Sequence, residues 1–217
     1  MNINYFQFSK ITLKINGVGD IDILGNNRNF KFDGIKYLEE VYINGIKNDT
    51  IGRTYYLNET ENLIELIWND EINSCIYMFY GCSKITEINL CNFNTSLVRS
   101  MKFMFNGCSK LISLNLDNLN TSLVTDMTSM FASCSSLASL NLSNFNTSLV
   151  KTMDAMFSFC SSLTSLNLSN FNTSLVKDMH SMFSLCSKLT SLNLFYFDTS
   201  HVTDMNQMFS SCKSLSY

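Results

Sequence analysis

The sequence predicts a protein of the α/β class, a right-handed solenoid with a parallel sheet on one face and short helices on the other, preceded by a small β-rich cap. In the 217-residue chain, six cysteines recur at a spacing of 26 residues, and a Met-Phe pair stands at a constant distance before each of them. The first seventy residues lack this period. Self-similarity at roughly 20 to 50 residues is typical of solenoids, whose units bury their apolar faces against their neighbours. The periodic cysteines are Cys82, Cys108, Cys134, Cys160, Cys186 and Cys212.

Residues 1–70 are predicted to form the β-rich capping domain. Apolar residues alternate with polar ones in the runs 11–15, 20–24 and 29–32, and glycines punctuate these runs, which is typical of short strands joined by tight turns. The runs 39–49 and 53–68 add aromatic and β-branched residues. We expect this domain to seal the N-terminal end of the core, with the single tryptophan, Trp68, bridging the two cores.

Residues 71–217 are predicted to form the solenoid, with five complete repeats and a truncated sixth. In the repeat that contains Leu140 and Leu142, these two leucines share one face of a strand, while Ser139 and Asn141 point the other way. We expect five such strands, stacked about 4.8 Å apart, to form one continuous parallel sheet. Phe145 then turns inward, and the Asn-Thr-Ser run that follows is expected to cap a short helix.

The predicted helix follows from apolar residues at steps of three and four. They form an inward stripe of the kind that an amphipathic helix presents to a core. Acidic residues at the start of three copies fit this prediction, because the helix dipole favours negative charge there. In one copy the stripe consists of Val150, Met153, Met156, Phe157 and Cys160, and the acidic residues are Asp126, Asp178 and Asp204.

A strand, an inward Phe, a capped turn, a short helix and a return make a leucine-rich-repeat coil. The pattern M-F-x-x-C-x-x-L-x-x-L-x-L-x-x-F-x-T-S-x-V-x-x-M, over roughly residues 72–217, resembles the repeat of the BspA-like leucine-rich-repeat surface proteins. The resemblance implies a cell-surface or secreted protein that binds host or matrix proteins, in the manner of an adhesin. The family has no common catalytic residues, so the resemblance implies none here.

Composition excludes several classes of partner. The net charge is −3, and neither part of the chain clusters Lys and Arg as a nucleic-acid surface would. No apolar run approaches the roughly 18 residues that span a bilayer, so no membrane insertion is expected. The first ten residues lack the pattern of a secretory signal, which leaves a cytoplasmic location as the alternative to the surface location that the resemblance implies.

No cofactor, metal or catalytic site is expected. A bridge between neighbouring cysteines of the 26-residue series would need converging Cβ vectors, so we expect a reduced, buried ladder, with Cys91 as the most exposed thiol. One cysteine per repeat on a single strip cannot supply a tetrahedral zinc site. His180 and His201 show no Ser or Cys plus carboxylate arrangement in the sequence. The sequence therefore predicts a protein that is not an enzyme.

Two surface features are candidate binding sites. Ser and Asn repeat on the outward strand face, where the amides could satisfy one another along the sheet or recognise a ligand. An aromatic pair replaces the Ser-Asn of other repeats and could contact a partner or cover the end of the core. The candidate residues are Asn89, Asn115, Asn141, Asn167, Asn193, Ser139, Ser165, Ser191, Phe195 and Tyr196.

The predicted function is non-catalytic recognition of a protein or a glycan, with adhesion at a cell surface. The alternative is a structural or assembly module whose copies stack through open ends of the solenoid. The repeat pattern stops at Tyr217, before the next strand, and an unpaired strand edge there could support self-association.

Overall fold

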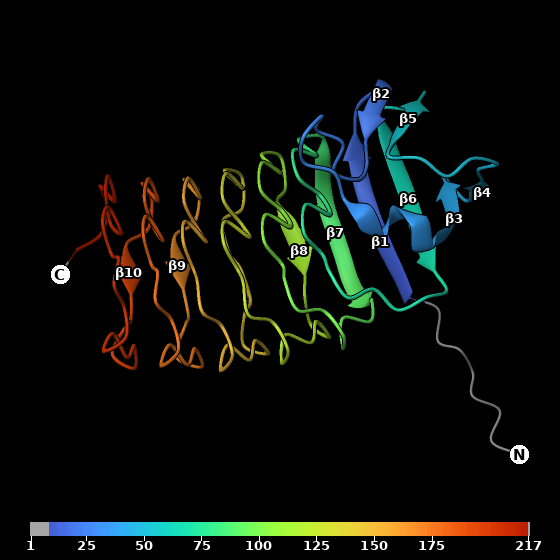
Figure 1. The fold of residues 1–217 in the computed structure, drawn as a ribbon. Helices are drawn as coiled ribbons and strands as arrows, with labels where there is room; N and C mark the ends of the chain where they lie inside the picture. The colour runs from blue at the N-terminus through green and yellow to red at the C-terminus, as the bar shows by residue number, and fades with distance from the viewer. Residues whose placement is uncertain (1–8, 217) are drawn as a thin grey trace, which may run out of the picture.

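The computed structural model describes residues 9–216, in which a β-rich region leads into a stack of coils (Figure 1). The first region contains a short 3₁₀ helix, η1 (Asp33–Tyr37). Its strands are β1 (Ser9–Asn16), β2 (Gly19–Asp22), β3 (Leu38–Ile43), β4 (Ile46–Lys47), β5 (Thr54–Leu57) and β6 (Glu61–Trp68). The prediction of short strands with tight turns is confirmed, except that the run 29–32 forms no strand and contributes only a β-bridge between Asn26 and Lys31.

One sheet joins the cap to the repeats. Its order is β4-β3-β6-β1-β7-β8, where β7 (Ile85–Asn92) and β8 (Ser113–Asn115) are the first two strands of the repeats. Strand β1 lies antiparallel to both β6 and β7. The buried ring of Trp68 lies 5.2 Å from the ring of Phe93 in the first coil, in an edge-on arrangement. Trp68 therefore bridges the two regions as predicted, and their apolar residues form one continuous core.

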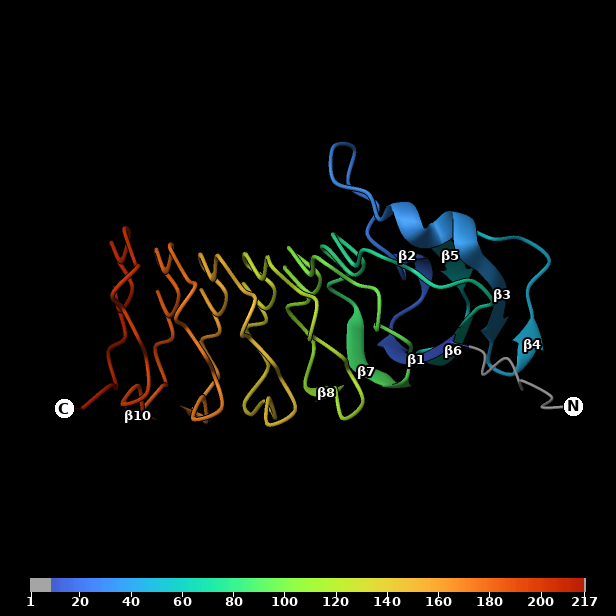
Figure 2. The ribbon, with the colours of Figure 1, turned by 60° about the horizontal axis from the view of Figure 1, so that its bottom comes forward.

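The predicted α-helices are wrong: residues 9–216 contain none, and the coils follow one another without a helix between them (Figure 2). In the segment predicted to be helical, the amide of Met156 donates to the carbonyl of Met153, and Cys160 donates likewise to Phe157, each over 3.1 Å. These are two consecutive tight turns. They place apolar residues inward at steps of three and four, which is the spacing that suggested a helix.

The amide of the third residue in each turn bonds to the next coil instead of to its own coil. Ala155 donates to His180 over 2.8 Å, and Phe159 donates to Ser184 over 2.8 Å. Both donors have left-handed backbone, with φ of 51° and 61°, which is incompatible with a continuing α-helix. The acidic residue expected in a helix first turn holds a turn as well, because the Asp178 carboxylate accepts the amide of His180 at 2.9 Å.

The predicted continuous parallel sheet is also wrong. Parallel pairing joins three residue pairs of β7 and β8 (Ser113–Asn115). It joins only two residue pairs of β9 (Ser165–Leu166) and β10 (Ser191–Leu192). The coil between β8 and β9 has no strand. Elsewhere the β-type pairing between coils is reduced to single bridges, such as Asp126 with Thr152. The fold is therefore nearly all β and turn with mixed sheets, not a solenoid with a parallel sheet and a helical face.

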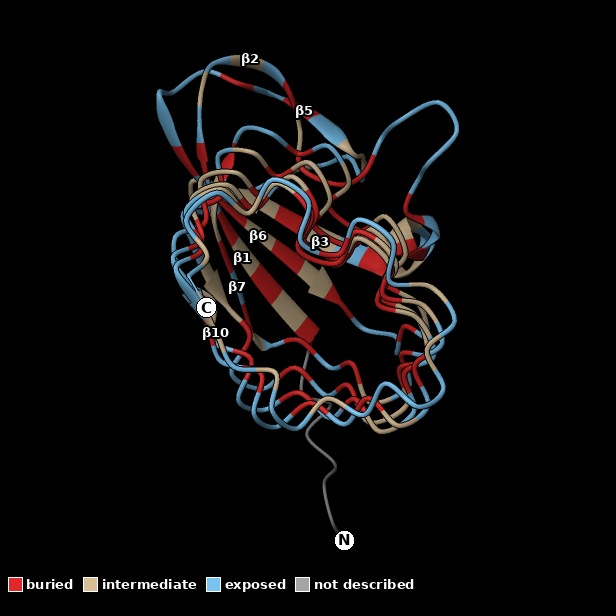
Figure 3. Cartoon of the chain, turned by 90° about the vertical axis from the view of Figure 1, so that its left-hand side faces the viewer, coloured by how far each residue is buried: buried red, intermediate tan, exposed pale blue. Residues whose placement is uncertain are grey.

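Identical side chains stack on one another through the core. Buried residues recur at equivalent places in successive coils when the stack is viewed end-on (Figure 3). The rings of Phe131 and Phe157 are nearly parallel, with centroids 5.6 Å apart, and the same column runs from Phe79 to Phe209. This stacking explains why the sequence repeats so closely, because each side chain must fit its own copy above and below.

A buried threonine clamps each coil to the next. The Thr147 hydroxyl donates to the carbonyl oxygen of Asn172 at 2.9 Å and accepts the Asn172 amide at 2.8 Å. The Asn-Thr-Ser run therefore does not cap a helix as predicted. Its Thr joins coils, and its Asn holds a turn, since Asn146 accepts the amide of Ser148. The same pair of hydrogen bonds recurs at Thr95 and Thr121. At Thr173 the hydroxyl donates to the carbonyl oxygen of Asp198.

Candidate functional site

The predicted Ser and Asn face lies on the outside of the coils. Ser139, Ser165 and Ser191 are exposed, as are all the predicted asparagines except the half-buried Asn115. Each asparagine side-chain oxygen accepts the amide hydrogen two residues further on, at 2.9 to 3.1 Å. The oxygen thus holds a turn, whereas the NH₂ groups make no hydrogen bond within residues 9–216. The face therefore presents a row of free amide donors.

This face carries no charge in the later coils. The segments 137–150, 163–176 and 189–197 contain no Asp, Glu, Lys, Arg or His. We call their outward side, with Ser139, Asn141 and their equivalents, the uncharged face. Hydroxyl and amide groups are its only polar side chains, so it can offer directional hydrogen bonds but no ion pairs.

Phe195 and Tyr196 form an exposed aromatic pair at one end of this face. Their rings lie edge to face with centroids 5.1 Å apart, and the residues are 83% and 64% exposed. Side chains this exposed do not cover the end of the core. The structure thus disfavours the purely structural interpretation of the pair.

Tyr196 also interrupts a contact between coils. At the equivalent position, the Asn170 side chain donates to the carbonyl oxygens of Leu142, Ser143 and Phe145 at 3.0, 3.4 and 2.9 Å. Asn144 makes the matching three contacts one coil earlier. A tyrosine ring has no NH₂ group to donate in this way. The last coil therefore lacks a contact that stabilises its neighbours.

The cysteines are free, as predicted. Cys91 is half-buried, and six of the eight are buried. Burial raises the pKa of the Cys108, Cys134 and Cys160 thiols well above their usual range, so these groups are protonated and unreactive at neutral pH. Among residues 9–216, no three His, Cys, Asp or Glu side chains are grouped to hold a metal ion.

The expectation that no histidine would have a serine and a carboxylate beside it is wrong for His180. Its Nδ1 lies 3.2 Å from the Asp154 carboxylate, and its Nε2 lies 3.5 Å from the Ser181 hydroxyl. Asp154 belongs to the preceding coil, so sequence spacing did not reveal the contact. Ser181 is only 8% exposed, which leaves little access for a substrate, and we assign the three residues to the packing of the coils.

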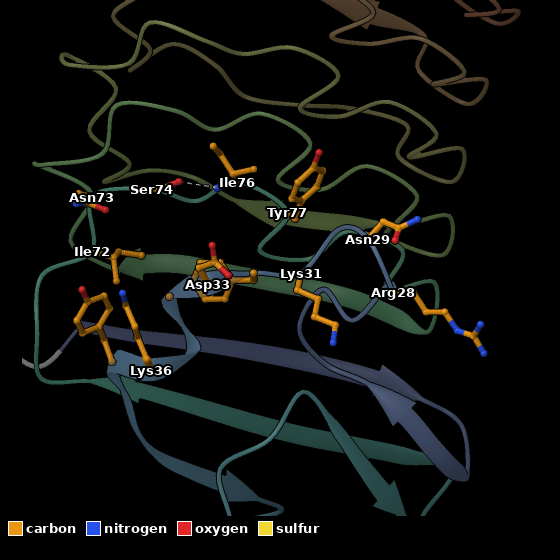
Figure 4. A pocket seen from close by; sticks show the side chains of 13 residues that line it. Arg28, Asn29, Lys31, Asp33, Lys36, Ile72, Asn73, Ser74, Ile76 and Tyr77 are labelled. Carbon is orange, nitrogen blue, oxygen red and sulfur yellow. Dashed lines mark hydrogen bonds between the residues drawn. The ribbon is translucent and has the colours of Figure 1, made fainter.

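Sequence reasoning missed a cavity of about 520 Å³ between the cap and the first coil. Figure 4 shows Asp33 of η1 between Lys36 on one side and Lys31 on the other, with Arg28 extending outward beyond Lys31. We call this space the junction cavity. Tyr37, Asn73, Ser74 and Tyr77 are also part of its lining. A usable signal was present in the sequence, because three basic residues fall within positions 28–36 of an otherwise acidic region.

Comparison with known proteins places the repeats in a family. A family described as "Mycoplasma protein of unknown function, DUF285" matches residues 73–166 and, in a second overlapping match, residues 139–217. No curated protein matches the chain, and no solved structure does. None of the described helices is long and apolar enough to cross a membrane. The two matches together cover about two thirds of the chain, and the protein therefore belongs to the DUF285 family.

Proposed function

We propose that this protein is a non-catalytic binding protein of a cell surface, and that it recognises a neutral glycan through the uncharged face and the Phe195–Tyr196 pair. The observation that carries the proposal is the exposed aromatic pair, which stands where neighbouring coils have an asparagine that fastens one coil to the next. The aromatic pair lacks this contact and is exposed to solvent. Binding of a ligand therefore explains the presence of the pair better than stabilisation of the fold does.

The chemistry of the surface favours a glycan over a charged protein. A sugar ring has an apolar face that an exposed aromatic ring can cover, and its hydroxyl groups can accept hydrogen bonds from free amides such as Asn167 and Asn193. Protein partners commonly pair charges at the rim of an interface, and the uncharged face has none to offer. The resemblance to BspA-like surface proteins supports the surface location.

A glycan array tests the proposal, with the wild-type protein compared to the double variant Phe195→Ser/Tyr196→Asn. We expect the wild type to bind neutral oligosaccharides and the variant to bind them at least ten-fold more weakly. Phe159→Ser is the matched control, because Phe159 is an aromatic residue, 52% exposed, that lies in the second tight turn and outside the uncharged segments. Equal binding by wild type and double variant, or binding to proteins alone, would overturn the proposal.

A further inference from the structure

The positive charges of the cap are divided between ion pairs and the junction cavity. Lys10, Lys14 and Lys47 pair with Glu65, Glu87 and Glu40. The remaining basic residues of positions 9–82 form no ion pair within the described chain. Three of these unpaired residues line the junction cavity, and the fourth lies behind its wall: Arg28, Lys31, Lys36 and Arg53.

Arg53 adds positive charge behind the cavity wall. The residue is half-buried, and its Nη2 donates to the carbonyl oxygen of Phe32, a lining residue, at 2.8 Å. Its Nε is buried and has no hydrogen-bond partner among the described residues. A half-buried cation without a carboxylate attracts an anion more strongly than a fully exposed one does, because solvent screens it less.

The loop that carries Arg28 and Lys31 is docked against the first coil. Gly25 donates its amide to the carbonyl of Met78 at 2.8 Å, and a Cβ at this glycine would lie 2.0 Å from the Tyr77 carbonyl oxygen. The ring of Phe30, between the two basic residues, lies 5.1 Å from the ring of Tyr77. The basic side chains therefore project from an anchored loop, so binding a ligand costs less ordering of the backbone.

Tyr77 occupies a backbone conformation that suits smaller residues. Its φ is 60°, in the left-handed region, where bulky side chains are disfavoured. The equivalent position holds Phe103 in the second coil and Ser129, Ala155, Ser181 and Gln207 in the later ones. The rings of Tyr77 and Phe103 stack with centroids 5.3 Å apart, so the neighbouring coil holds the Tyr77 ring in place beside the junction cavity.

The lining combines basic, polar and aromatic groups with one carboxylate, that of Asp33, so basic side chains outnumber acidic ones there. Lys31 and Lys36 can pair with an anionic group, Asn73 and Ser74 can bond to hydroxyls, and Tyr77 can cover an apolar ring face. The volume of about 520 Å³ falls within the size range of small-ligand sites. We infer that the junction cavity is a second binding site, separate from the uncharged face, for a sugar ring that carries a carboxylate or a phosphate.

Titration calorimetry of the full chain tests this inference. The four ligands are trigalacturonic acid, glucose 6-phosphate, a neutral galactose trimer and inorganic phosphate. Fluorescence localises the site, because the single tryptophan, Trp68, donates to the carbonyl of the lining residue Gly34 at 3.3 Å. We expect at least one anionic sugar to bind and to change the tryptophan fluorescence. Comparison of trigalacturonic acid with glucose 6-phosphate shows whether the site prefers a carboxylate or a phosphate on the sugar. Binding of none, or equal binding of inorganic phosphate or the neutral trimer, overturns the inference.

Paired variants assign the binding to the cavity. We expect Lys31→Gln/Lys36→Gln to weaken anionic-sugar binding at least ten-fold, while Lys110→Gln/Lys188→Gln, which removes two exposed charges of the coils, changes it less than two-fold. Phe195→Ser/Tyr196→Asn should leave it unchanged, so failure of the glycan proposal would not mimic failure here. Equal losses in the two lysine pairs would show general charge attraction and contradict a site at the cavity.

Discussion

The thiol of Cys134 donates a hydrogen bond to the main-chain carbonyl oxygen of Phe105, over a sulfur-to-oxygen distance of 3.2 Å. The same relationship, a cysteine bonded to the phenylalanine 29 residues before it, recurs at Cys108, Cys160, Cys186 and Cys212. The cysteine therefore fills the core and also satisfies a carbonyl of the previous coil. A disulfide would remove this donor, which agrees with the free state of all eight cysteines.

Alkaline pH should unfold the protein steeply. Burial raises the pKa of the Cys186 thiol to about 12 and raises those of the other five buried cysteines well above their usual range. Unfolded thiols ionise near pH 8.5, so above that pH the unfolded state releases protons that the folded state keeps, and stability falls until the folded pKa is reached. Six thiols give a limiting slope of about 8 kcal/mol per pH unit.

Urea unfolding between pH 7 and 10 measures this slope. Cys134→Ala/Cys160→Ala should reduce it by about a third, because two of six groups are removed. A stability that is constant over this range would contradict the buried, protonated ladder. The count of thiols after unfolding without reductant should be eight, and a count of six or fewer would contradict the absence of disulfides.

Thr147→Val should destabilise the stack. Valine has a similar shape but leaves the amide and carbonyl of Asn172 without their partner, at a cost of about 2–4 kcal/mol in the free energy of unfolding. Thr190→Val is the control, since the side chain of the exposed Thr190 makes one hydrogen bond, to the carbonyl of Thr164, and the loss of this bond should cost under about 0.5 kcal/mol. Similar urea midpoints for the two variants would refute the clamp.

The two functions of the repeated asparagine can be separated at Asn167. Asn167→Asp keeps the oxygen that accepts the Ser169 amide, so the free energy of unfolding should change by less than about 0.5 kcal/mol. Asn167→Ala removes it and should cost about 1 kcal/mol. Both variants lose the NH₂ donor and should weaken glycan binding. Retention of binding by the Asp variant would show that the donor is not used.

The sequence allowed most strand positions in the cap and the inward residues of each coil to be predicted, because burial dictates apolar periodicity whatever the local backbone is. It did not reveal the absence of helices, since two tight turns give the same spacing. Gly81 and Gly107 did carry a signal: they share one repeat position and have φ of 73° and 80°. A recurrent glycine there favours left-handed backbone over a helix interior.

The two candidate sites also differ in how far the sequence could predict them. The exposure of Phe195 and Tyr196 followed from their departure from the repeat, so the sequence alone could suggest it. The junction cavity depends on how the loop around Lys31 docks against Tyr77, 46 positions later in the chain. No periodic pattern links these residues, and only the folded arrangement brings them together.

The central claim is that Phe195 and Tyr196 bind a ligand, and that Tyr196 does so in place of an asparagine that would stabilise the fold. The Tyr196→Asn variant tests this claim most directly. The new amide should restore the contact that Asn170 makes with the preceding coil, adding about 1 kcal/mol and raising the melting temperature by about 2–4 °C. The same variant should bind neutral glycan more weakly than wild type. A lower melting temperature with unchanged glycan binding would contradict the account.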